Sequence, residues 1–122
     1  DCYAPGDPRC DSFGGWTMLK LDKLDYASVI EGLRKGNFYC STGPALEELY
    51  IQDNALHIKC SPVEKIYVIT EGRRCMMKLA EPGQTVSEAV FPLRGDEGYV
   101  RVDCRDAHGC HAYSNAYFLD TL

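Results

Sequence analysis

The chain has 122 residues, of which 45% are apolar and 25% are charged, so it has the composition of a globular protein and not of a disordered one. This length fits one domain, or one small domain with a piece of another. The excess of acidic over basic residues gives a net charge of −5, which would repel a phosphate backbone, so we expect no nucleic-acid partner. No apolar run approaches the about 20 residues of a membrane span, and we expect no membrane partner.

The first 44 residues are mixed in character. Residues 1–15 are rich in Gly and Pro and predict a loop, and residues 16–21 predict a short strand. Residues 25–35 predict a helix, with Asp25 as its N-cap and Gly36 in the left-handed position after its last turn. The apolar residues of this helix recur at helical spacing and form one face: Tyr26, Val29, Ile30 and Leu33.

From residue 45 onward apolar residues alternate with polar ones, which is the period of a β-strand. We expect strands at 46–51, 55–60, 64–70, 74–80, 86–93, 98–106 and 110–119, separated by segments of turn composition. Strands that are apolar on one face only belong to antiparallel sheets. The sequence therefore predicts a mainly β fold: an antiparallel, immunoglobulin-like two-sheet sandwich of about seven strands, preceded by a loop, a short strand and one α-helix.

The sequence contains seven cysteines: Cys2, Cys10, Cys40, Cys60, Cys75, Cys104 and Cys110. An odd number does not favour a disulfide framework, and a domain of this size can bury a core without one. Cys60 and Cys104 fall on the apolar phase of predicted strands, where a free thiol acts as a small buried apolar group. We therefore expect reduced cysteines and a cytoplasmic location.

One segment offers a spacing that a metal ion could use. His108 and His111 form an H-x-x-H pattern beside Cys104 and Cys110, which a structural zinc ion could bind. The same segment has the composition of a turn, and we favour that interpretation. The sequence has no nucleophile elbow, phosphate-binding glycine loop or suitably spaced carboxylate pair, so we expect no catalytic residues in this chain.

A family resemblance is carried by residues 33–44, with the sequence L-R-K-G-N-F-Y-C-S-T-G-P. This segment resembles a signature found late in bacterial PHP-family metal-dependent phosphoesterases, and its most specific part is the cluster Ser41, Thr42, Gly43 and Pro44. Shorter matches to the same family are found at 11–18, 60–66, 99–102 and 112–115. The resemblance thus covers nearly the whole chain.

The resemblance implies that most of the catalytic apparatus would lie upstream of Asp1. PHP enzymes hold divalent metal ions, such as Zn, Mn or Fe, in a (β/α)7-type barrel whose last metal-binding motif is D-x-H. Asp1 could be the aspartate of a remnant of this motif, with Tyr3 in place of the ligand histidine, although a phenol is a poor substitute for imidazole. The resemblance implies no cofactor in this fragment and metal-dependent hydrolysis of a phosphoester by the parent protein.

By the same resemblance, residues 1–44 correspond to the end of a PHP catalytic barrel and residues 45–122 to an appended β-sandwich domain. The expected function is that of a non-catalytic C-terminal accessory domain, which packs against the barrel or shapes access to it. The expected partners are the barrel of the same chain and, through the exposed helix face, a second copy. The alternative is a freestanding immunoglobulin-like module for carbohydrate or protein, which an exposed aromatic row of Tyr113 and Tyr117 would favour.

Overall fold

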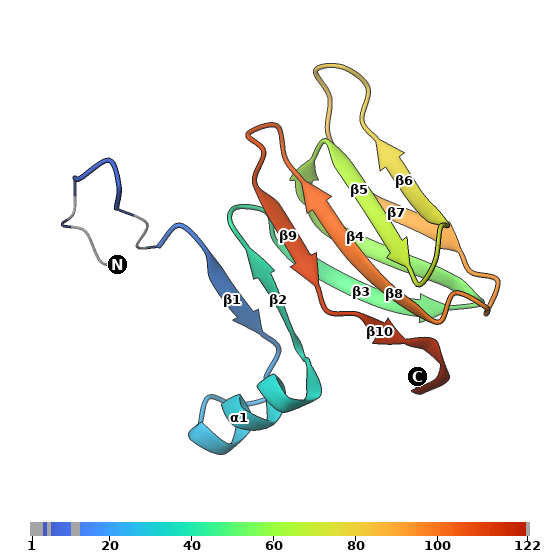
Figure 1. Cartoon of the computed structure of the whole chain (residues 1–122), viewed down its shortest axis with the longest axis horizontal. Helices are drawn as coiled ribbons and strands as arrows, with labels where there is room; N and C mark the ends of the chain where they lie inside the picture. Colours follow the sequence, from blue (N-terminus) through green and yellow to red (C-terminus); the bar gives the residue numbers. More distant parts are fainter. Residues whose placement is uncertain (1–3, 5, 11–12, 122) are drawn as a thin grey trace.

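Two β-sheets pack face to face in the computed structural model, which describes residues 4, 6–10 and 13–121 (Figure 1). The larger sheet contains β1 (Trp16–Leu19), β2 (Phe38–Ser41), β5 (Lys65–Thr70), β6 (Cys75–Leu79), β8 (Tyr99–Arg105), β9 (His111–Ser114) and β10 (Tyr117–Phe118). The smaller sheet contains β3 (Leu46–Gln52), β4 (Ala55–Val63) and β7 (Val86–Pro92). All the strand pairs are antiparallel. The predicted mainly β, two-sheet sandwich is confirmed.

The strand order decides which parts of the two sheets can cover each other. The larger sheet has the order β1-β2-β9-β8-β5-β6, with β10 pairing separately with β8, and the smaller has the order β3-β4-β7. In Figure 1 the smaller sheet lies behind β8, β5 and β6, whereas β1 and β2 stand to one side together with the helix α1 (Tyr26–Lys35). A 3-10 turn, η1 (Leu119–Thr121), follows β10. No helix in the described ranges is long and apolar enough to cross a membrane.

The core lies between the sheets and is centred on β4, β5 and β8. Every second side chain is buried along β5 and β8, and along β4 as far as Cys60, which is the pattern expected where one face of each sheet is covered. The buried apolar residues are Leu56, Ile58, Cys60, Val63, Ile66, Val68, Ala89, Phe91, Val100, Val102, Cys104 and Ala112. The expected role of Cys60 and Cys104 as buried apolar groups is confirmed, and all six cysteines within the described ranges are free thiols.

The helix α1 begins and ends where the sequence predicts. The carboxylate of Asp25 accepts the backbone N–H of Ser28 at 2.7 Å, which satisfies one of the amides that the first turn leaves open. Gly36 follows the last turn with φ 75°, a left-handed conformation that glycine adopts without the penalty of a side chain. The capping residues therefore determine this helix.

The predicted apolar face of α1 is only partly covered in this chain. Tyr26 is 83% exposed, Leu33 44% and Ile30 37%. The helix instead contacts the rest of the chain at Gly32, where an added Cβ would lie 2.7 Å from Cδ2 of Leu21. Gly32 thus lets the helix backbone approach the β1 side closely, while most of the apolar face points elsewhere.

β2 is not among the predicted strands, because Phe38, Tyr39 and Cys40 do not alternate with polar residues. It pairs with β1 on one side and with β9 on the other, where Cys40 lies opposite Tyr113. The larger sheet therefore runs across residue 44. The division into residues 1–44 and 45–122 remains a prediction about the parent protein.

The predicted strand at 110–119 is two strands, β9 and β10. Tyr113 pairs with Asp103, but Tyr117 pairs with Val100. The chain thus advances four residues from β9 to β10 while the partner strand β8 advances three. This one-residue slip is the effect of a bulge, which breaks the ladder and turns the strand. At the break, the side-chain amide of Asn115 donates to the carbonyl oxygen of Gly36 at 2.7 Å and ties the end of α1 to the larger sheet.

Candidate functional site

A groove of about 780 Å³ opens where the larger sheet extends past the smaller one. We use the term overhang for β1, α1 and β2, and the groove lies between the overhang and β3. Its apolar lining comes from both sheets: Met18, Tyr39, Leu46, Leu49, Leu56 and Val100. Met18 is 47% exposed, so this lining is accessible to a partner.

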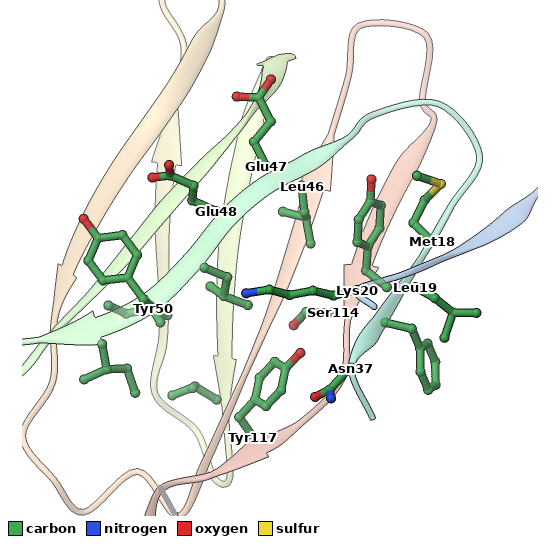
Figure 2. Close-up of a pocket in the computed structure, with 16 residues that line it drawn as sticks. Met18, Leu19, Lys20, Asn37, Leu46, Glu47, Glu48, Tyr50, Ser114 and Tyr117 are labelled. Carbon is green, nitrogen blue, oxygen red and sulfur yellow. The ribbon is translucent and has the colours of Figure 1, made fainter. Parts of the chain in front are cut away.

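Polar groups are distributed unevenly around the groove. Figure 2 shows the side chain of Lys20 reaching across the hollow between Leu46 and Tyr117, while Glu47 and Glu48 lie along β3. Burial raises the pKa of Tyr117, so its phenol stays neutral and can donate a hydrogen bond. The groove therefore combines an apolar floor with one lysine side chain across it and two carboxylates along β3.

Ser114 also lines the groove, but its hydroxyl is already used. It accepts the backbone N–H of Val102 at 2.8 Å and donates to the carbonyl oxygen of Asn115 at 2.9 Å. Its role is to hold β8 against the end of β9. A hydroxyl with both functions occupied is a poor candidate for binding or catalysis.

The cluster Ser41 to Pro44 lies where the chain passes from β2 in the larger sheet to β3 in the smaller one, and we call this segment the crossing. The hydroxyl of Ser41 donates to the carbonyl oxygen of Pro44 and accepts the N–H of Gly43 at 3.0 Å. The N–H of Thr42 donates to the carbonyl oxygen of His111 at 2.9 Å, and its hydroxyl accepts the N–H of His111 at 3.0 Å. These contacts account for the cluster as a structural element that holds β2 and the start of β3 against β9.

Gly43 explains why this crossing tolerates no side chain. An added Cβ would lie 2.8 Å from Cβ of Cys110 and 3.2 Å from Oδ2 of Asp106. Carbon atoms do not approach that closely without a shift of the backbone. The most specific part of the family-like signature is therefore occupied by packing and hydrogen bonds within the chain.

The candidate zinc ligands are not brought together. Cys104 is fully buried between the sheets, whereas His108 lies in the β8–β9 turn and is exposed. That turn is organised by Asp106, whose carboxylate accepts the N–H groups of His108 and Cys110, each at 2.9 Å. Across residues 4, 6–10 and 13–121, no group of three or more His, Cys, Asp or Glu could hold a metal ion. Asp1 and Tyr3 lie outside the described residues.

His111 has a different partner, which was not among the predicted site residues. Its Nδ1 lies 2.8 Å from Oδ1 of Asp103, and its ring stacks on that of Tyr113 at 5.1 Å between centroids. The predicted turn at 107–109 could have revealed this pair, because a tight hairpin there places Asp103 and His111 on one face of β8 and β9. The pair orients the imidazole but lies outside the groove.

Tyr113 and Tyr117 do not form an aromatic row. Tyr113 is 40% exposed and stacks on His111, whereas Tyr117 lines the groove and packs against the core. The bulge between β9 and β10 separates them. The feature that would have favoured a carbohydrate-binding face is therefore not found at these two residues.

Comparison with protein-family models, with curated proteins and with solved structures gives no match. The resemblance to PHP phosphoesterases consequently rests on the sequence motifs alone. Of the features described, the groove and the exposed apolar residues of the overhang have the properties of a binding surface.

Proposed function

We propose that this chain is a non-catalytic accessory domain of a PHP-type metal-dependent phosphoesterase, and that its overhang packs against the catalytic barrel. The observation that carries the proposal is the exposed apolar surface of the overhang. Trp16 is 44% exposed, Met18 47% and Leu33 44%, while Tyr26 is 83% exposed. All four residues lie within positions 16–33, and exposed apolar residues that are grouped in this way mark interaction sites.

The energy of covering that surface supports a packing role. Fully burying one such side chain stabilises an assembly by about 1.5–3 kcal/mol. The ten-residue helix α1 is also too short to be stable without tertiary contacts, and the chain supplies few of them on its apolar face. A neighbouring domain that covers α1 and β1 would bury the exposed apolar side chains and would also give the helix its missing tertiary contacts.

The hydrogen bonds between the overhang and the sandwich support the second part of the proposal, that the domain shapes access to a catalytic site. β2 pairs with β9, the Ser41–Pro44 crossing bonds to His111, and Asn115 bonds to Gly36. A barrel that packs against the overhang would therefore fix the orientation of the whole sandwich relative to the barrel. The metal ions of the parent enzyme would activate water and polarise the phosphoryl oxygens, and we assign their ligands to the barrel.

The coding sequence upstream of Asp1 tests this proposal most directly. We expect the His-rich and Asp-rich metal-binding motifs of a PHP barrel there. A different kind of domain upstream, or no further domain, would overturn the proposal.

A pair of variants then tests the packing surface in the longer protein. Met18→Asp should separate the sandwich from the barrel, because a carboxylate cannot be buried there without a partner, and limited proteolysis between them should become faster. Val90→Asp is the matched control, since Val90 is 58% exposed on the outer face of the smaller sheet, away from the overhang. Equal proteolysis of both variants and the parent would contradict a packing role for the overhang.

A further inference from the structure

We propose that β3 accepts an added β-strand from the catalytic barrel, an extended segment in which apolar residues alternate with Lys or Arg. This inference rests on the proposed function, since it names how the barrel engages the groove. Its starting point is the unequal width of the two layers. The larger sheet continues from β9 to β2 and β1, while the smaller sheet ends at β3.

The free edge of β3 provides the backbone groups for such a strand. Among residues 4, 6–10 and 13–121, the strand that pairs with β3 is β4 alone. Along the other edge of β3, every second residue therefore directs its N–H and C=O away from the sheet. The register shift in β3 lies between Leu46 and Glu48, and the pairing is regular from Glu48 to Gln52. Natural edges are usually blocked by bulges or kept short, but this regular stretch is open beside the groove.

Side chains on the inner face of β3 show that a covering layer is missing there. Ile51 pairs with Leu56, which is buried in the core, so both point inward. Yet Ile51 is 38% exposed, and across the groove Met18 is 47% exposed. A strand beside β3 would place its own inward residues between these two, which requires those residues to be apolar.

The outer face of β3 sets the charge of the added strand. Glu48 pairs with Lys59 on β4, so its carboxylate is on the outer face, and Glu47 at the register shift is exposed as well. A strand on the other side of β3 would place its outward residues beside these carboxylates, where Lys or Arg is favoured and Asp or Glu is disfavoured. Lys20 is exposed and has a flexible side chain, so it can leave the hollow as the strand enters.

A tethered segment tests the inference on this chain alone. The sequence K-V-K-I-K-V, joined to the N-terminus by a flexible Gly/Ser linker, would be present at an effective concentration of about 1 mM. Within residues 48–52, we expect the backbone amides that point to the free edge of β3 to exchange with deuterium at least tenfold more slowly than in the parent chain. The control segment K-P-K-P-K-P has the same charge but lacks the N–H donor at every second residue, and proline is disfavoured within a sheet, so it should give much weaker protection.

Two matched variants locate the added strand. Met18→Glu should abolish the protection of β3, because it places a carboxylate on the far wall of the groove. Met77→Glu should leave it unchanged, since Met77 is 57% exposed on β6 at the opposite edge of the larger sheet. The inference is overturned by protection of β6 instead of β3, by equal protection from the proline segment, or by no protection at all.

These results can be separated from the test of the proposed function. If a barrel is present upstream of Asp1 but the tethered strand gives no protection, the domain packs without strand addition. If β3 is protected but no barrel is present, β3 is a strand-accepting edge whose partner is not a PHP barrel, and the source named here is wrong.

Discussion

The sandwich core and the overhang follow the same local rules but differ in how far their apolar residues are covered. In the core, Ile66, Val68 and Cys104 have no exposed surface. In the overhang, Met18 and Leu33 remain almost half exposed although they lie on a well-formed strand and a well-capped helix. Alternation and capping are therefore enough to specify strands and helices. The apolar side chains of those strands and helices become a buried core only where a second layer covers them.

The sharpest way to break this comparison is to truncate one residue in each region. Ile66→Ala should lower the free energy of unfolding by about 2–5 kcal/mol, because it leaves a cavity between the sheets. Met18→Ala should change the free energy of unfolding by less than about 1 kcal/mol, because the Met18 side chain is half exposed and buries little apolar surface. Urea unfolding of the two variants measures both values. Similar losses would mean that the overhang has a core of its own.

The crossing between the two regions should be sensitive to a single methyl group. Gly43→Ala should destabilise the chain by about 1–3 kcal/mol, since the added Cβ would overlap Cys110. Gly15→Ala is the matched control, because its Cβ would lie 3.6 Å from the nearest atoms, an ordinary contact. Thermal unfolding distinguishes them. A Gly43→Ala chain as stable as the control would show that the crossing can shift.

An acid-sensitive contact at Glu97 stabilises the loop between β7 and β8 of the sandwich. Burial acts to raise the pKa of Glu97, but the N–H groups of Arg94 and Gly95, at 2.6 and 2.8 Å, outweigh it and hold the pKa below its usual value. Because the pKa is lower in the folded chain, Glu97 stabilises it above the pKa of the unfolded state, and this contribution is lost as the pH falls through the folded pKa.

Glu97→Gln checks that prediction. The variant should lose about 1–2 kcal/mol at pH 7, because a charged acceptor of two hydrogen bonds is replaced by a neutral one. Its stability should also fall less steeply than that of the parent chain below about pH 4.5. Urea unfolding at a series of pH values measures the difference. An unchanged acid dependence would mean that other carboxylates control it.

The smallest effect on stability should come from labelling exposed thiols, which also reports how tightly each region is closed. Cys40 on the overhang and Cys75 on β6 are exposed and should react with iodoacetamide within minutes without unfolding the chain. The pKa of Cys104 is raised by its hydrogen bond to Cys60 and by burial, so this thiol should stay unlabelled. Mass spectrometry of peptides from the native protein gives the order. Early labelling of Cys104 would show that the core opens.

Local sequence patterns were sufficient for the elements whose signals lie within a few residues. The Asp25 and Gly36 caps defined α1, and alternation located β4, β5 and β8 close to their observed bounds. β2 was missed because its apolar residues do not alternate. The break between β9 and β10 was missed because a bulge depends on pairing with β8, which no single segment encodes.

The candidate site was less accessible to prediction than the fold. The groove brings Met18, Leu49 and Tyr117 together from three strands that are distant in sequence, so its existence depends on the sheet order. That Ser41 to Pro44 form a family signature stays a prediction. Their hydrogen bonds to His111 connect residues 69 positions apart, so the segment alone could not reveal its structural role. The Asp103–His111 pair can be predicted from the sequence, because the register of the β8–β9 hairpin places both side chains on the same face.

The pairing of β2 with β9 also sets an order for the assembly of the chain during synthesis. Thr42 and His111, which bond across this contact, are 69 residues apart. When the overhang leaves the ribosome, the strand it must join has not yet been made, and the loop to be closed is long. While the sandwich is being translated, the overhang is therefore free to pack against a domain that was synthesised earlier. It can pair with β9 only when nearly the whole sandwich has been made.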